Sequence, residues 1–123
     1  MKQNRWFKYI GMAAFALVLS AMAAPTAQAL TVNAFVVRQS CVNGDIVQVT
    51  LSATVQPHLQ VRYRWDFNND GVFDTGLLLN PTITHRYPDE RLRTARVMAV
   101  TPNGVRAFDR VTFMTRRCGG GGG

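Results

Sequence analysis

The sequence predicts one all-β domain, an antiparallel β-sandwich of about seven strands, preceded by a cleavable signal-peptide helix. The chain of 123 residues fits one compact domain plus an appendage, and its 47% of hydrophobic residues is too many for a disordered chain. Beyond residue 29, apolar and polar side chains alternate with a period of two between turn residues. The residues before that point have the composition of a leader.

The leader is marked by charge, hydropathy and small residues. Lys2, Arg5 and Lys8 make the first ten residues basic, and residues 9–24 form an uncharged run rich in Ala, Met, Leu and Phe. The segment Pro-Thr-Ala-Gln-Ala then supplies a helix break and a small-x-small cleavage site. An uncleaved membrane anchor is the competing interpretation, but the run is shorter than the ~20 residues that span a bilayer. We therefore expect residues 1–29 to be a signal peptide and the protein to be exported to the periplasm, the cell surface or the medium, with no transmembrane span after cleavage.

The exported part is expected to be a β-sandwich domain over residues 30–118 with a flexible glycine tail over residues 119–123. Asn-Gly-Asp and Pro-Asn-Gly are among the turn signals that divide the strands. No window shows a helical period. The best-marked strands are residues 31–38, 46–55, 61–67 and 105–115.

The clearest alternation lies in residues 61–67. One face of this strand is apolar and is expected to enter the core, whereas the other is polar and is expected to face water. The core face would be Val61, Tyr63, Trp65 and Phe67, and the wet face Arg62, Arg64 and Asp66.

The two cysteines, Cys41 and Cys118, would meet an oxidising compartment after export. No second thiol or histidine pair stands at ligand spacing, so a disulfide is favoured over metal ligation. Closing a loop of this length would stabilise the fold by about 4 kcal/mol on the chain-entropy model. Two free thiols or an intermolecular bond are the alternatives.

Three motifs resemble a known family. Residues 63–71 read Tyr-Arg-Trp-Asp-Phe-Asn-Asn-Asp-Gly, residues 84–87 Thr-His-Arg-Tyr and residues 94–97 Thr-Ala-Arg-Val. They are similar to the PKD (polycystic kidney disease) domain, in which a Y-x-W-D-F segment ends one strand and an H-x-Y segment precedes a long strand. The resemblance covers residues 44–115 and implies an immunoglobulin-like β-sandwich. One departure is residues 88–93, which replace the Pro-Gly-x-Tyr turn that usually enters the long strand.

The register of that long strand follows from its alternation. We expect Ala95, Val97 and Ala99 to point inward, and Thr94 and Arg96 to point outward.

The resemblance also implies where the cysteines and the aromatic residues lie. In an immunoglobulin-like order, the first turn, with Cys41, and the end of the last strand, before Cys118, lie at the same pole. The bridge would then hold the tail of the domain closed. The residues expected in structural core roles are Tyr63, Trp65, Phe67, His85 and Tyr87.

Residues 66–74 match the first nine positions of a calcium loop, with oxygen side chains at positions 1, 3, 5 and 9 and a glycine at position 6. The twelfth position, normally a bidentate Glu, is Leu77, so any Ca²⁺ affinity would be weak, near ~0.1 to 1 mM. An ordinary turn held by Asx hydrogen bonds is an equally open interpretation. The candidate metal ligands are Asp66, Asn68, Asp70, Val72 (through its carbonyl) and Asp74.

The composition favours a protein that is not an enzyme. No hydroxyl or thiol nucleophile stands at a persuasive spacing from His85, and the three loop acids crowd one segment instead of flanking a cleft. Residues 30–123 hold eleven arginines, no lysine and seven acids, a net charge of +4. This charge is weaker than that of a dedicated basic groove, so we do not expect nucleic acid as a partner and expect the arginines to face solvent. The arginines considered for one wet surface are Arg62, Arg64, Arg91, Arg93, Arg96 and Arg106.

Two functions from different classes fit these observations. The first is an exported binding module that contacts a polysaccharide, a matrix polymer or a protein through exposed aromatic or arginine side chains on a sheet face. The second is a structural spacer or assembly subunit, rigidified by calcium and a disulfide. The fold alone does not choose between them, and the sequence does not give the oligomeric state.

Overall fold

The protein is described by a computed structural model that covers residues 29–119. The predicted signal peptide, except for its last residue, and residues 120–123 of the glycine tail lie outside the described residues. Within them the chain forms six strands and no helix, so no membrane-crossing helix occurs there. The strands are β2 (Thr31–Asn43), β3 (Ile46–Gln56), β4 (Arg62–Asp66), β5 (Ile83–Pro88), β6 (Leu92–Val100) and β7 (Arg106–Met114).

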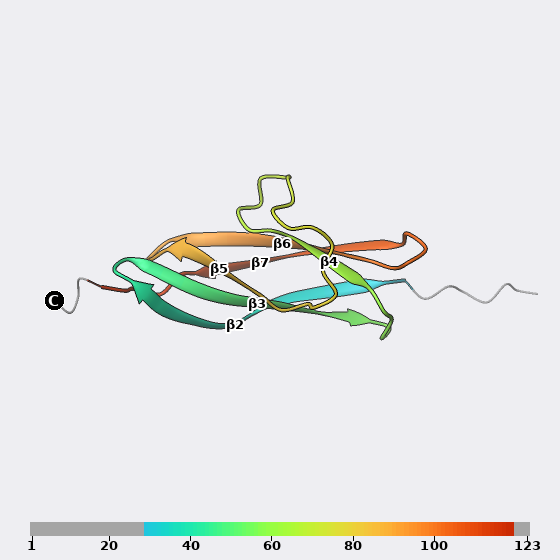
Figure 1. The fold of residues 1–123 in the computed structure, drawn as a ribbon, viewed down its shortest axis with the longest axis horizontal. Helices are drawn as coiled ribbons and strands as arrows, with labels where there is room; N and C mark the ends of the chain where they lie inside the picture. The colour runs from blue at the N-terminus through green and yellow to red at the C-terminus, as the bar shows by residue number, and fades with distance from the viewer. Residues whose placement is uncertain (1–28, 120–123) are drawn as a thin grey trace, which may run out of the picture.

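These strands form two three-stranded antiparallel sheets. The first has the order β2-β3-β5 and the second the order β4-β6-β7. The sheets lie one above the other along the length of the domain (Figure 1). The all-β prediction with two antiparallel sheets is confirmed. Over residues 29–119 the strand count is six instead of about seven, and between β4 and β5 Leu78 makes only an isolated bridge with Tyr63.

The core fills the space between the sheets, because alternate residues of each strand point inward. In the first sheet, β3 contributes most of the buried apolar residues. In the second sheet, β4 and β6 contribute them. The predicted inward residues of β6 have no exposed surface, so the register preferred from sequence is confirmed. The buried set includes Val47, Val49, Leu51, Val61, Tyr63, Trp65, Phe67, Tyr87, Ala95, Val97, Ala99 and Phe113.

The first strand is longer than predicted. It pairs with β3 as far as Asn43, so Cys41 lies opposite Val47 inside the ladder instead of in the turn. A two-residue turn at Gly44 and Asp45 reverses the chain, and Gly44 has a φ of +56°, a left-handed conformation that glycine adopts without steric cost.

One end of the sandwich is closed by a disulfide. Cys41 and Cys118 are bonded, with their Cα atoms 5.6 Å apart, which confirms the predicted bridge. The backbone N–H of Cys118 donates to Asp89 Oδ2 at 2.8 Å. The next residue, Gly119, lies so close to the hairpin that an added Cβ would come within 2.7 Å of the Gly44 carbonyl oxygen. The C-terminal segment is therefore fixed against the turn between β2 and β3. We call this the cystine end.

Candidate binding face and the Asp66 loop

The outer face of the β4-β6-β7 sheet carries three rows of side chains that cross the strands. The strand register places Arg62 beside Val100 and Arg106, then Arg64 beside Met98 and Phe108, then Asp66 beside Arg96 and Arg110. We call this surface the arginine face. Paired residues of antiparallel strands project to the same side of a sheet, so five arginines from three strands share one surface. Its arginines are Arg62, Arg64, Arg96, Arg106 and Arg110.

Two of the guanidinium groups on this face lie over phenylalanine rings. Arg64 and Arg96 both lie over the ring of Phe73, each 5.0 Å from its centroid. Arg96 also lies 4.9 Å from the centroid of Phe108. Such cation–π contacts restrict the orientation of a planar guanidinium. Arg64 also donates from its Nε to the Thr75 carbonyl at 3.2 Å. The long side chains also cover Met98, which is 5% exposed although it points away from the core.

The arginine face holds most of the surplus positive charge of residues 30–123. Its five arginines and the single Asp66 leave a charge of +4, whereas the six other arginines of residues 30–123 are balanced by six other acids. Two of those acids, Asp70 and Asp74, lie on the loop beside this face. Among the described residues, Arg96 is the only arginine of the face with a carboxylate partner, at 3.9 Å from Asp66. The other four lack a carboxylate partner there, although Arg64 donates to the Thr75 carbonyl and Arg110 donates to Asn69 Oδ1.

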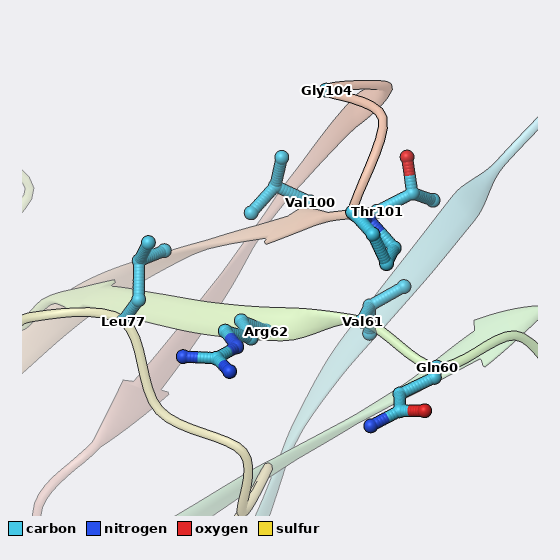
Figure 2. Close-up of a pocket in the computed structure, with 8 residues that line it drawn as sticks. Gln60, Val61, Arg62, Leu77, Val100, Thr101 and Gly104 are labelled. Carbon is cyan, nitrogen blue, oxygen red and sulfur yellow. The ribbon is translucent and has the colours of Figure 1, made fainter.

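A hollow of about 510 Å³ adjoins the first row of the face. It lies between the start of β4, the end of β6 and the turn after it (Figure 2). In Figure 1 this part of the sandwich is at the end opposite the turn between β2 and β3, near which Cys41 is bonded to Cys118. Arg62 and Val100 belong to both the hollow and the face, and Leu77 forms an apolar wall. The hollow has the size of ordinary small-ligand sites. Its lining residues are Gln60, Val61, Arg62, Leu77, Val100, Thr101, Pro102 and Gly104.

Asp66, which opens the predicted calcium loop, lies on the outer face of β4 as predicted, but the expectation that it faces water is wrong. The residue has no exposed surface. Its Oδ1 accepts the N–H of Asp70 at 3.2 Å and its Oδ2 accepts the N–H of Gly71 at 2.9 Å. The loop folds back over the carboxylate, so these amides and Arg96 take the place of water.

The other two loop acids also bind backbone amides. Asp74 Oδ2 accepts the N–H of Phe67 at 2.7 Å, and Asp70 Oδ1 accepts the N–H of Val72 at 2.9 Å. This last hydrogen bond is the main cause that lowers the pKa of Asp70 below its usual value. Each carboxylate of the loop therefore closes a local turn.

The predicted metal ligands make hydrogen bonds within the loop. The oxygens of Asp66, Asp70 and Asp74 accept amide hydrogens, and the guanidinium of Arg96 approaches Asp66. Within residues 29–119, no three His, Cys, Asp or Glu side chains are grouped so that they could hold a metal ion. Asn68 is exposed on the same loop. The geometry follows the Asx-turn alternative, and calcium binding by the loop stays a prediction.

His85 and Tyr87 lie against the core, as expected for structural roles. The His85 ring stacks on Phe67 with a centroid distance of 4.0 Å and meets the edge of Tyr87 at 4.7 Å. Burial lowers the pKa of His85 and strongly raises that of Tyr87, because the charged form of each is disfavoured away from water. The Tyr87 hydroxyl donates to the carbonyl of Phe67 at 2.7 Å, which ties β5 to the beginning of the loop.

The structure brings together only part of the arginine set considered from sequence. Arg62, Arg64, Arg96 and Arg106 share the face, but Arg91 lies in the turn before β6. Arg93 is paired with Phe113 on the inward side, and its guanidinium lies 5.9 Å from the centroid of Tyr87.

Three members of the face were not identified from sequence: Arg110, Phe73 and Phe108. The alternation of Arg106, Phe108 and Arg110 along β7 is visible in the sequence and could have indicated two of them. Phe73 reaches the face from the loop, and no sequence pattern marks that contact.

Comparisons of the chain with models of known protein families, with curated proteins and with solved structures found no match.

Proposed function

We propose that this protein is an exported, non-catalytic, PKD-like binding module that contacts a polysaccharide or a protein at the cell surface through the arginine face. The observation that carries the proposal is the gathering of five arginines from three strands on one exposed sheet face, two of them ordered by phenylalanine rings. Export is supported by the leader-like residues 1–29, and by the disulfide, which forms in oxidising compartments.

The test is retention of the chain, recovered after export, on a panel of insoluble polysaccharides and on whole-cell envelopes. We expect retention on at least one support, and a marked loss for the double variant Arg64→Gln, Arg106→Gln. The matched control is Arg38→Gln, Arg86→Gln, which removes two exposed arginines from the outer face of the other sheet. The proposal fails if no support retains the chain, or if the two double variants lose retention equally.

A second candidate function is a structural spacer or assembly subunit of an extracellular structure. It is favoured by the shape of the domain, because the start of β2 and the residues after β7 leave it at opposite ends (Figure 1). The disulfide rigidifies one of these ends. Sedimentation would distinguish the two functions: elongated, concentration-dependent self-association without retention on any support is expected for the spacer, and a monomer that is retained is expected for the module.

A further inference from the structure

We infer that the arginine face selects acidic polysaccharides, chains that carry carboxylate or sulfate groups, over neutral ones. This inference rests on the proposed function and names the ligand class of the same surface. Its first support is what the aromatic rings do. Neutral sugars and nucleobases are bound by stacking on bare aromatic faces, but Arg64 and Arg96 lie over Phe73, and Arg96 also lies over Phe108. The rings therefore support guanidinium groups, and the face presents charged donors.

The donors are suited to anions that offer two oxygens side by side. A guanidinium held over a ring has a restricted orientation, and its fork of N–H groups matches two oxygens of a carboxylate or sulfate. Arg62, Arg64 and Arg106 have no carboxylate within ion-pair distance among the described residues. Arg110 uses its Nε to donate to Asn69 Oδ1 at 2.9 Å, which orients its remaining N–H groups. Arg64, Arg96 and Arg110 are thus already ordered before a ligand arrives, which reduces the entropic cost of binding.

The spacing of the arginines fits a repeating anion better than a single one. Arg62 and Arg64 are two residues apart on β4, about 7 Å. Arg62 and Arg106 lie two strands apart in one row, which is about 10 Å. A lone carboxylate would engage one of these sites, whereas an extended chain of acidic sugars would engage several. The hollow beside Arg62 gives such a chain a concave place for one of its rings.

The experiment compares two polymers that share a backbone and differ in charge. Polygalacturonic acid carries a carboxylate on every sugar, and its fully methyl-esterified form carries none. Heparin supplies a sulfated chain, and single-stranded DNA is a polyanion of another class. Affinities of the chain recovered after export would be measured by interferometry at two salt concentrations, for the parent protein and for both double variants, R64Q/R106Q and R38Q/R86Q.

We expect polygalacturonic acid or heparin to bind at least about tenfold more tightly than the ester, with an affinity that falls as salt rises. R64Q/R106Q should lose about tenfold of that affinity, and R38Q/R86Q less than about twofold. Preservation of the melting temperature in both variants would show that each is folded.

The outcomes separate this inference from the proposed function. Equal binding of the acid and the ester would overturn the selection of acidic chains and leave a binding module for neutral ones. Tighter binding of DNA than of either acidic polysaccharide would also overturn it. An equal loss in the two double variants would overturn the placement on the arginine face. Absence of binding to all four polymers, together with absence of retention on the wider panel, would remove the proposed function as well.

Discussion

The two ends of the sandwich differ in how they are held. At the cystine end, the disulfide is reinforced by Gln39, whose side chain donates to the Met114 carbonyl and accepts the N–H of Arg116. At the other end, the turn after β6 is organised by Thr101, and the hollow beside it is open. The contacts that hold the domain closed are therefore at one end, and the candidate ligand site is at the other. Substitutions on the arginine face should therefore leave folding largely unchanged, and loss of the disulfide should leave the binding surface intact.

Removing the disulfide should have the largest effect on stability and tests whether the two ends are independent. The double variant Cys41→Ser, Cys118→Ser should lose about 4 kcal/mol of unfolding free energy, because the unfolded chain regains the entropy of an open loop. Urea denaturation followed by tryptophan fluorescence measures it. In conditions where the variant is folded, it should still bind the polymer that the parent binds. An unchanged urea midpoint would mean that the hydrogen bonds alone close this end.

Thr115 tests how much buried hydrogen bonds stabilise the cystine end. Its side chain is 1% exposed, and its hydroxyl accepts the N–H of Arg91 at 2.8 Å and donates to the carbonyl of Pro88 at 2.9 Å. Thr115→Val preserves the shape but leaves both partners without their hydrogen bond, at a cost of about 2 kcal/mol. Thr115→Ser is the matched control and should be nearly neutral. A loss for Ser as large as for Val would show that the methyl group matters more than the hydroxyl.

Thr101 is the counterpart of Thr115 at the open end. Its hydroxyl accepts the N–H of Val105 at 2.9 Å and donates to the side chain of Asn103. Because Asn103 and Val105 are exposed, water can replace these bonds after Thr101→Val, and we expect a loss of about 1 kcal/mol. The same urea series measures it. A larger loss of unfolding free energy than that of Thr115→Val would contradict the expectation that the cystine end is held more firmly than the open end.

His85 gives a smaller, pH-dependent effect that involves neither end. Burial lowers its pKa in the folded state, so the unfolded chain binds the proton more readily. Stability should therefore be fully present above the unfolded pKa of about 6.5 and fall as the pH decreases through it towards the folded value. His85→Phe retains a ring against Phe67 and should flatten this slope between pH 7 and pH 5. A slope that His85→Phe leaves unchanged would mean that another group titrates.

Calcium should have the smallest effect. Because the carboxylates of the Asp66 loop already accept backbone amides, we expect the melting temperature to be unchanged by millimolar calcium or by a chelator. Calorimetric titration of calcium into the protein is the direct measurement. Heat of calcium binding that disappears in Asp70→Asn would contradict this expectation and would support the calcium site predicted from the sequence.

The strands and the disulfide could be predicted because they depend on local patterns. Period-two alternation identified the core faces of residues 61–67 and of β6. A chain with two cysteines allows only one intramolecular disulfide. The burial of Asp66 could not be predicted, since it results from a loop folding over its own first residue. The arginine face could not be predicted either. Arg64, Arg96 and Arg110 come together through the pairing of three strands, and alternation within one strand does not fix the register between strands.

The position of the disulfide decides how the domain would respond to a mechanical pull. Tension applied between residue 30 and residue 119 would run along β2 to Cys41 and cross the sulfur bridge to Cys118, a shortcut past 77 positions of the chain. The strands from β3 to β7 lie inside that covalent loop and would carry little load. Stretching could straighten or peel β2, but it could not unravel the arginine face.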